Sequence, residues 1–317
     1  MKIVNHVVIL LALCCTLFSC VKEDLSLCPD FNVGLTFSYT LNVADEDKFA
    51  DEVKVIGLYI FDSNGKYVGF QSENNITFSK EYQMPVSLAP GIYDFVVWAN
   101  YDPKFYEVCS VKDHLPLEVG KSTFAEAMLL LKNTEGVVGT ELPDLFHGIV
   151  TRAEIKESGV QRQKIMLIKN TNVCNVKLQN TESILRFITK APAAELQMEI
   201  TGDNGFMSFD NSLLPQMPQI IYKPYKTVGG SEFEFEVMRL RMEKKMMLRV
   251  IHPITGAVVL EKDLIQLILK SGEVKSNEDF DRIDNYDIVI AFGENVATDA
   301  TITINGWVVE QPESDLN

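Results

Sequence analysis

The residues best placed to do chemistry are Ser19 and Cys20, which follow an almost unbroken apolar run at 7–18. This run comes after the positively charged Lys2 and is too short to span a bilayer, so it has the layout of a secretory signal. In a bacterial lipoprotein signal, a small residue stands directly before a cysteine, and the thiol receives a diacylglycerol before the peptidase cleaves. We therefore expect cleavage between Ser19 and Cys20, with a diacylglycerol and an N-acyl chain (palmitate) on Cys20. We expect no other cofactor.

One alternative to this lipoprotein signal remains open. Phe18 is an unusual residue at the third position of the signal box, and an ordinary cleaved signal peptide can also end in cysteine. With the lipoprotein interpretation, residues 1–19 form the signal peptide. The segment 20–30 that follows is short, charged and without periodicity, so it is expected to be a tether, lipidated at its first residue.

The other residue types that usually support catalysis are too scattered to suggest a site. His6 belongs to the signal, and the remaining histidines, His114, His147 and His252, lie in three unrelated contexts. The sequence has no His-Glu-x-x-His helix, Cys-x-x-Cys pair, nucleophile elbow or glycine-rich phosphate loop. We therefore predict that the protein is not an enzyme and that it binds neither a metal ion nor a small-molecule substrate.

Two acidic segments contain residues of the types that bind calcium. Residues 62–65, Asp-Ser-Asn-Gly, resemble the start of a calcium loop, but the closing glutamate of such a loop is missing. A β-hairpin turn explains this segment better. Residues 278–287 contain several acids, and we expect them to form a solvated loop that leads into a strand.

The charge of the chain excludes two classes of partner. The sequence has 29 Lys and Arg residues against 44 Asp and Glu residues, a formal net charge of −15. Because nucleic-acid binding depends on neutralising phosphates, we expect no nucleic-acid partner. The protein surface is equally unsuited to an anionic membrane, so a lipid would have to hold the protein there.

The cysteines limit the possible disulfides. After loss of the signal and lipidation of Cys20, three cysteines remain, namely Cys28, Cys109 and Cys174. An odd number permits at most one disulfide within the chain. We favour a disulfide between Cys28 and Cys109, because both lie in the first half of the sequence.

The pattern of apolar residues predicts an all-β protein with one or two short helices. Every second residue is apolar at 32–41, as in a strand with one buried face, and 53–61 is more uniformly apolar, as in a strand covered on both faces. Further strands are expected at 66–71, 92–99, 164–178, 184–189, 196–201, 232–237, 246–251, 257–260, 286–292 and 301–309. A short helix is expected at 124–131, where an apolar strand is the alternative. A second short helix is expected at 263–270, where Asp263 would be the cap.

A repeated arrangement of elements predicts the domain organisation. A strand, an Asp/Asn/Gly turn and a second strand follow one another at 53–71, 196–210 and 246–260. This repetition is typical of two related β-sandwich domains in tandem. Residues 156–159 are polar and contain glycine, so they are the expected link. The N-terminal domain would then cover 31–158 and the C-terminal domain 159–317.

The last predicted strand is the best candidate for a contact with another protein. Residues 301–309 are β-rich and nearly uncharged, and they precede a polar tail. An edge strand presents unpaired backbone groups that another chain can complete. The residues expected to form this partner strand are Thr301, Ile302, Ile304, Trp307 and Val309. The alternative is that the strand only completes its own domain.

Five segments together resemble one family, the lipoprotein anchors and minor subunits of type V pili in Bacteroides-like bacteria. They occur in the order of that family and span nearly the whole mature chain. They lie at 20–29, 52–65, 88–100, 145–148 and 304–307. The resemblance implies two tandem transthyretin-like Greek-key β-sandwich domains, attachment to the outer membrane through the lipid on Cys20, and pilin subunits as partners in a fimbria.

The resemblance also implies the fate of the first strand. In this family, polymerising subunits lose an N-terminal strand to proteolysis and a neighbour's C-terminal strand fills the groove, whereas an anchor keeps its own strand. The mature chain has no arginine before Arg152, so an arginine-directed protease could not release the strand at 33–41. The acidic Glu23 and Asp24 resemble the surface-export tether of such lipoproteins. We therefore expect an anchor or minor subunit on the cell surface.

The alternative from a different functional class is a surface lipoprotein that binds glycans for nutrient uptake. Such binding normally needs exposed aromatic side chains beside polar groups. A solvent-exposed cluster of Trp98 or Trp307 with Tyr101 and Tyr106 would support this alternative. Buried tryptophans and an open strand edge would support the fimbrial role.

Overall fold

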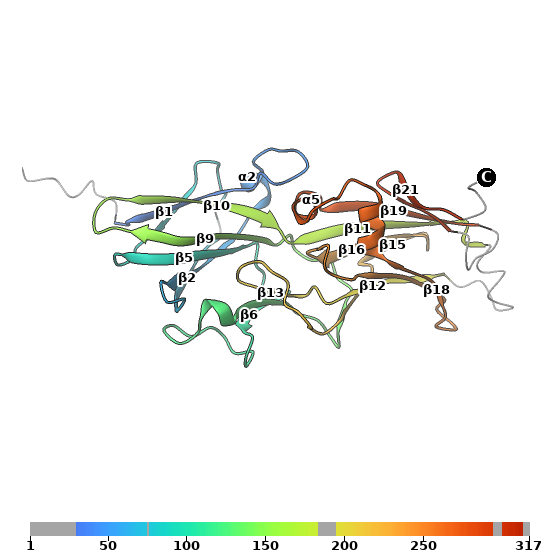
Figure 1. The fold of residues 1–317 in the computed structure, drawn as a ribbon, viewed down its shortest axis with the longest axis horizontal. Coiled ribbons are helices and arrows are strands. Elements are labelled where there is room, and N and C mark those ends of the chain that lie inside the picture. The colour runs from blue at the N-terminus through green and yellow to red at the C-terminus, as the bar shows by residue number, and fades with distance from the viewer. Residues whose placement is uncertain (1–29, 75, 183–194, 294–299, 313–317) are drawn as a thin grey trace, which may run out of the picture.

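The computed structural model describes residues 30–312 except for 75, 183–194 and 294–299. The protein is an elongated molecule made of two β-rich halves arranged end to end (Figure 1). β1 (Val33–Ser38) begins near one end, and β21 (Trp307–Glu310) lies in the half at the other end. The predicted all-β fold class is confirmed. None of the helices in these residues is long and apolar enough to cross a membrane.

The first half is built on a seven-stranded sheet in the order β3-β2-β5-β9-β10-β1-β4. Besides β1, its strands are β2 (Ile56–Asp62), β3 (Tyr67–Glu73), β4 (Gln83–Val86), β5 (Gly91–Ala99), β9 (Phe146–Ile155) and β10 (Gln161–Lys169). β9 and β10 pair only between Phe146–Gly148 and Leu167–Lys169 and separate beyond this short stretch. As a result, β3, β2, β5 and β9 form one layer, and β10, β1 and β4 form the other. A hydrophobic core that includes Leu35 and Phe95 lies between these layers.

β1 is an internal strand of this sheet. It pairs in parallel with β10, from Val33 opposite Gln161 to Ser38 opposite Met166, and it pairs antiparallel with β4. The side chains of Val33 and Leu35 are fully buried, as the alternating sequence predicted. The first strand of the chain therefore lies within its own sheet. The short helix α2 (Phe49–Glu52) follows it.

β2 lies at the centre of the first half and is covered on both faces. Leu58 and Ile60 point into the core between the two layers, whereas Tyr59 and Phe61 pack into a second core on the outer face. This double burial explains why the sequence of β2 is almost uniformly apolar. It confirms the prediction made for residues 53–61.

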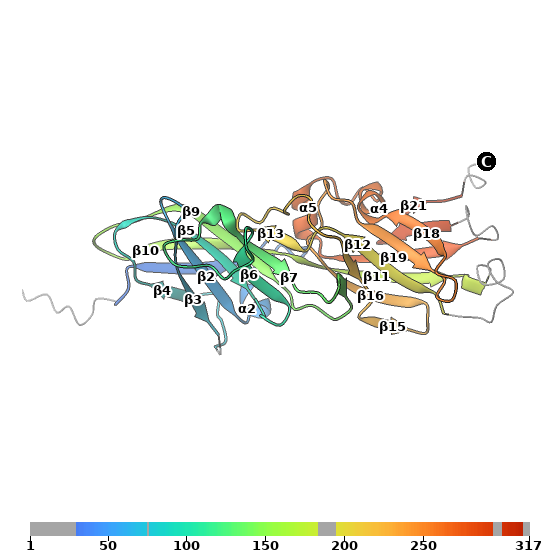
Figure 2. The same ribbon diagram turned by 90° about the horizontal axis from the view of Figure 1, so that it is seen from below.

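The segment between β5 and β9 extends from the first half to the second half, where its strands pair with strands of the second half (Figure 2). It contains β6 (Tyr106–Ser110), a 3-10 turn at Phe124–Glu126, β7 (Ala127–Leu131) and β8 (Val137–Val138). β7 pairs with β13 (Phe206–Ser208), and β8 pairs with β14 (Ile220–Tyr222), both from the second half. The helix predicted at 124–131 is limited to this 3-10 turn, and the alternative of an apolar strand is confirmed for β7, because its partner strands on both sides override its local helix preference.

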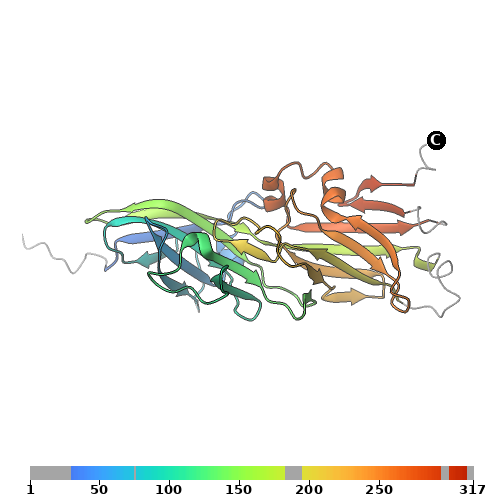
Figure 3. The same ribbon diagram turned by 60° about the horizontal axis from the view of Figure 1, so that its bottom comes forward.

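The second half contains two sheets, in the orders β15-β16-β11-β19-β20-β21 and β18-β17-β12-β14-β8. Their remaining elements are β11 (Thr171–Gln179), β12 (Gln197–Gly202), β15 (Lys226–Val228), β16 (Glu232–Met238), β17 (Met247–Ile251), β18 (Val258–Asp263), β19 (Asn285–Phe292), β20 (Ala300–Ile304) and the helices α4 (Leu264–Lys270) and α5 (Asn277–Arg282). Figure 3 shows these helices, in orange and red, along one edge of the half. The predicted cap of α4 is confirmed, since Asp263 accepts hydrogen bonds from two backbone N–H groups of its first turn.

The two halves meet at Asn170 rather than at the predicted link. Residues 156–160 form the turn between β9 and β10, which belong to one sheet, so the predicted boundary between 158 and 159 does not separate the halves. The single strand predicted at 164–178 is instead two strands, β10 and β11, in different sheets. Asn170 is fully buried between them.

Two of the three predicted strand–turn–strand units form hairpins, and the third does not. Those at 53–71 and 246–260 are hairpins, β2–β3 and β17–β18, as predicted. The unit at 196–210 is not a hairpin, because β12 and β13 lie in different sheets. The strand predicted at 184–189 and the predicted signal at 1–19 lie outside the described residues.

Candidate functional site

The predicted contact strand at 301–309 is a hairpin rather than a single strand. β20 and β21 pair across Asn305 and Gly306, whose φ angles are 48° and 85°. Positive φ at both positions is typical of the type I′ turn, for which Asn-Gly is the favoured sequence. β20 also pairs with β19, so it is an internal strand. β21 is the last strand in the order of its sheet.

The residues predicted to face a partner therefore fall into two groups. Thr301, Ile302 and Ile304 belong to β20, which is paired on both sides, and both isoleucines are fully buried. Trp307 and Val309 belong to β21, at the edge. The side chains and backbone groups available to a partner are thus those of β21 and not those of β20.

Trp307 and Val308 expose apolar surface on this edge strand. Their exposed fractions are 58% and 57%. Glu273, which follows α4, fixes the turn beside them. Its carboxylate accepts hydrogen bonds from Nε1 of Trp307 at 3.2 Å and from Nδ2 of Asn305 at 2.8 Å. β21 is therefore held in place while its outer side has no partner strand in the described part of the chain.

The aromatic residues considered for a glycan site form no exposed cluster. Trp98 and Tyr106 are fully buried, and Tyr101 is only partly exposed. Trp98 packs against His147 with a distance of 4.6 Å between the ring centroids. Trp98, Tyr101 and Tyr106 belong to the first half, whereas Trp307 lies on the last strand of the second half.

A cleft of about 1080 Å³ lies where the two halves meet. One wall comes from β9 and β10 in the first half, and the opposite wall comes from α5 and the segment that follows β16 in the second half. The lining residues that determine its chemistry are His147, Asn211, Arg239, Arg241, Asn277 and Asp281. Sequence reasoning missed this site, since its residues are far apart along the chain.

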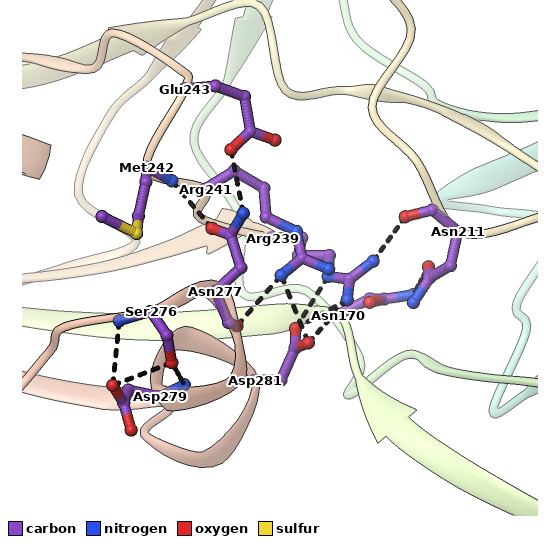
Figure 4. Close-up of polar contacts among 10 residues, drawn as sticks. All are labelled: Asn170, Asn211, Arg239, Arg241, Met242, Glu243, Ser276, Asn277, Asp279 and Asp281. Carbon is purple, nitrogen blue, oxygen red and sulfur yellow. Dashed lines mark hydrogen bonds and ion pairs between the residues drawn. The ribbon is translucent and has the colours of Figure 1, made fainter.

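A buried ion-pair network forms one side of the cleft (Figure 4). Arg239 is 3% exposed, and it donates to Asp281 from Nε at 2.9 Å and from Nη2 at 2.7 and 2.9 Å. Arg241 donates from Nη1 to Asp281 at 3.2 Å and to the backbone carbonyl of Asn277 at 3.0 Å. Two guanidinium groups thus share the carboxylate of Asp281, and the carboxylate of Glu243, which accepts a hydrogen bond from Nδ2 of Asn277 at 3.0 Å, adds a second negative charge beside them.

The same network reaches the point where the two halves meet. Nη1 of Arg239 donates to the backbone carbonyl of Asn211. Oδ1 of Asn211 accepts a hydrogen bond from Nδ2 of Asn170 at 2.7 Å. Because Asn170 connects the two halves, this buried network links their relative placement to the cleft wall.

Two further sets of ion pairs cross the junction. Arg282 of α5 pairs with Asp45, which lies in the loop after β1. Lys169, at the end of β10, pairs with Asp144 at 2.8 Å and with Asp284 at 2.9 Å. Although burial opposes the charge, the two carboxylates raise the pKa of Lys169, so this side chain remains charged.

The acidic segment predicted as a solvated loop largely forms helix α5. Ser276 and Asp279 form a capping box, in which each side chain accepts a hydrogen bond from the backbone of the other residue. The helix directs Asp281 into the buried network, whereas the side chain of Glu278 is 72% exposed. Among the described residues, no group of three or more His, Cys, Asp or Glu side chains is arranged to hold a metal ion.

His147 is a buried histidine beside the cleft and should make stability depend on pH. Its Nε2 donates to the backbone carbonyl of Phe209 at 2.9 Å, and the residue is 2% exposed. Burial lowers the pKa of His147 from 6.5 to about 4. The unfolded chain therefore takes up this proton at a higher pH than the folded protein. We expect a loss of up to about 3 kcal/mol in the free energy of unfolding as the pH falls from 6.5 to 4.

The measurement compares urea unfolding of the wild type and His147→Gln between pH 7 and pH 4. Glutamine retains a donor for Phe209 but does not titrate. The wild type should therefore lose stability relative to the variant as the pH falls. Burial also raises the pKa of Glu236 to about 7, which makes the folded protein more stable as the pH falls. Both proteins contain Glu236, so this contribution cancels when they are compared. A difference that did not change with pH would contradict the prediction.

The predicted modification sites lie mostly outside the described residues. Ser19, Cys20 and Cys28 belong to the segment before residue 30, so lipidation and the disulfide between Cys28 and Cys109 remain predictions. Cys109 is buried beside Met128, and burial raises the pKa of its thiol to about 11. Cys174 is also buried, which raises the pKa of its thiol to about 12.

The chain is similar to several known proteins. The family model described as fimbrillin-A associated anchor proteins Mfa1 and Mfa2 matches residues 25–312. No curated protein matches the sequence. A solved Bacteroides thetaiotaomicron structure, described as a proposed polysaccharide-binding protein, is 26% identical with a TM-score of 0.76, covering 89% of this chain and 98% of that one.

Two further solved structures share the fold at lower identity. The fimbrial anchor protein Mfa2 from Porphyromonas gingivalis is 20% identical with a TM-score of 0.71, covering 88% of this chain and 98% of that one. A proposed adhesin from Bacteroides ovatus is also 20% identical with a TM-score of 0.72, covering 87% of this chain and 94% of that one.

Proposed function

The chain belongs to the family of fimbrillin-A associated anchor proteins Mfa1 and Mfa2, and from this membership we propose that it is a non-enzymatic anchor or minor subunit that fixes a fimbria to the outer membrane. The family match over residues 25–312 carries the proposal, because it includes both halves of the molecule. The proposed partners are the pilin subunits of that fimbria. The proposed location is the cell surface.

At one end of the molecule, the lipid on Cys20 would hold the protein in the membrane. The apolar run at 7–18 and the pair Ser19-Cys20 support this part of the proposal. The described chain begins at Asp30, three residues before β1, and this end is opposite the half that contains β21 (Figure 1). A membrane at the first end and a fimbria at the other would fit this arrangement.

The position of β1 supports an anchor rather than a polymerising stalk subunit. Both sides of β1 are paired, with β10 and with β4, so β1 occupies the place that a donated strand would take. The lack of arginine before Arg152 in the mature chain also supports retention of this strand. The first half would then be closed to a neighbouring subunit.

At the other end, we propose that a pilin strand adds to β21. Main-chain hydrogen bonds to an open sheet edge supply affinity in such contacts, and exposed apolar side chains such as Trp307 and Val308 add to it. Backbone groups of successive residues in an antiparallel pair point alternately toward and away from the partner strand. Val308 follows Trp307, the residue that closes the turn, so its N–H should point toward the open side.

The test uses two variants in the bacterium that produces the protein. Cys20→Ser should release the protein and its fimbriae into the medium, because the thiol is the site of lipidation. Val308→Pro should leave the protein in the membrane but detach the fimbriae, because proline removes an N–H on the open side without removing a bond to β20. Membrane fractionation and electron microscopy measure the two effects.

Val308→Thr is the matched control, since threonine keeps the N–H and the β-branched shape, and fimbriae should remain attached. Deleting 301–317 would be a poorer test, because it also removes the buried Ile302 and Ile304. A Cys20→Ser protein that stayed in the membrane fraction would refute the lipid anchor. Fimbriae that stayed attached to Val308→Pro would refute the contact at β21.

Glycan binding is the weaker proposal for this chain. It is suggested by the Bacteroides thetaiotaomicron structure, which is described as a proposed polysaccharide-binding protein. However, Trp98 and Tyr106 are buried, so they cannot form an aromatic platform with Trp307. An open edge at β21 fits a structural role better.

A further inference from the structure

We infer that the pilin strand that adds to β21 also carries a lysine or arginine just outside its paired stretch, and that a hollow beside the β20–β21 turn receives this side chain; this rests on the proposed function. The residues of the hollow that matter here are Val43, Glu273, Asp284, Asp287 and Gly306. The length of β21, the exposed apolar surface past the turn and the charge of the hollow each support it.

β21 is too short to bind a partner strand well by its backbone alone. It has four residues, Trp307–Glu310. Because successive residues of an antiparallel strand point their backbone groups to alternate sides, about two of these residues face the open side. The partner strand therefore gains few main-chain hydrogen bonds and needs further contacts beside β21.

The exposed apolar surface of β21 continues past the turn to the first half of the molecule. Gly306, which directly precedes Trp307, lines the hollow of about 410 Å³. Val43, from the loop after β1, lines the same hollow and is 69% exposed. A segment that pairs with β21 and runs on past Trp307 therefore enters the hollow and contacts both halves.

The lining of the hollow is negatively charged. It contains the three carboxylates of Glu273, Asp284 and Asp287, and among the described residues no lysine, arginine or histidine lines it. Lys270 and Lys275, the lysines nearest to Glu273 along the chain, are not part of the lining. Charge complementarity therefore favours a cationic side chain in this hollow.

Most of this negative charge has no cation beside it. Glu273 accepts hydrogen bonds from two neutral side chains of the hairpin, and Asp287 accepts one from the neutral Nδ2 of Asn175 at 2.9 Å. In the described part of the chain, the one ion pair that the three acids make is between Asp284 and Lys169, at 2.9 Å. Two of the three carboxylates are thus available to a cation from a partner.

The hollow suits a long cationic side chain better than a metal ion. Among the described residues, no group of three or more acids, histidines or cysteines is arranged to hold a metal. A lysine or arginine needs only one or two carboxylate oxygens. Its aliphatic stem can pack on Val43 and Ile283, which line the hollow beside the acids.

The test measures fluorescence anisotropy of two labelled peptides with the mature chain, residues 20–317. Both peptides have blocked ends and the core Thr-Val-Thr-Val-Thr, flanked at each end by two lysines in one and by two glutamines in the other. Lysines at both ends allow either direction of pairing. The lysine peptide should bind about tenfold more tightly at low salt, and salt of about 0.5 M should remove most of this difference.

Asp287→Asn should weaken binding of the lysine peptide about threefold and leave binding of the glutamine peptide unchanged. Asp287 is exposed, so the melting temperature should not fall. Glu157→Gln is the matched control, because it removes the same charge from an exposed residue in the turn between β9 and β10, at the opposite end of the molecule. It should not affect either peptide.

The two peptides separate a failure of this inference from a failure of the proposed contact at β21. Equal binding of both peptides to the wild type would overturn the inference and leave the contact at β21 standing, whereas binding of neither peptide would overturn both. A lysine peptide that bound Val308→Pro as tightly as the wild type would show a general attraction to an acidic protein, which also overturns the inference. Equal losses with Asp287→Asn and Glu157→Gln would do the same.

Discussion

Asp281→Asn should lower the free energy of unfolding by about 3–5 kcal/mol, the cost expected when one partner of a buried ion pair is lost. Asp281 is 8% exposed and accepts hydrogen bonds from Arg239 and Arg241. Asparagine has almost the same shape but no charge. The variant would therefore leave two guanidinium groups in the wall of the cleft without their counter-ion.

Urea unfolding at pH 7 measures this effect, and Glu278→Gln is the matched control. Glu278 lies on the same helix, its side chain is 72% exposed, and it contacts Arg282 only at 3.8 Å. Its replacement should change the free energy of unfolding by less than about 0.5 kcal/mol. Similar losses in both variants would show that the effect comes from α5 itself and not from the buried charges.

Removal of β1 should have a still larger effect. A chain that begins at Asn42 lacks the side chains of Val33, Leu35, Phe37 and Tyr39, none of which is more than 4% exposed. Burying an apolar side chain of this size contributes about 1.5–3 kcal/mol. The loss is therefore on the order of 6–12 kcal/mol, which is comparable to the total stability of a domain. We expect the chain 42–317 to be unfolded or insoluble by circular dichroism and sedimentation.

A synthetic peptide of residues 31–41 should restore folding of this shortened chain, because it can pair with β10 and β4 as β1 does. The same peptide with Leu35→Asp is the matched control. It should fail, since it would bury a charge in the core. The chain 30–317 keeps β1 and should fold without any peptide. Stable folding of 42–317 alone would contradict the prediction.

The sequence predicted the elements that depend on local patterns. The alternation at 32–41 gave β1, the uniformly apolar run gave the doubly covered β2, and Asp263 gave the start of α4. The hairpin at the C-terminus could also have been predicted. Asn305-Gly306 between β-rich residues is a strong signal for a two-residue turn, and this turn divides 301–309 into two strands.

The junction could not be predicted, because it depends on contacts between distant parts of the chain. β7 finds its partner β13 in the other half, and Asn170 separates two apolar strands without any loop signal. Arg239 and Asp281 are 42 residues apart, and only the fold brings them together. The capping box at Ser276 could have indicated α5, but nothing local shows that Asp281 is buried against two arginines.

The parallel pairing of β1 with β10 determines how the molecule would bear a pulling force. The chain enters β1 at Val33 and leaves β10 at Lys169 toward the second half, and both strands run in the same direction. Tension between a membrane tether and a fimbria would therefore slide the two strands along each other. The hydrogen bonds between them would resist together, whereas a strand that is peeled from its end loses them one at a time. In this geometry β1 is loaded in shear, and the strand that closes the sandwich also becomes its mechanical clamp.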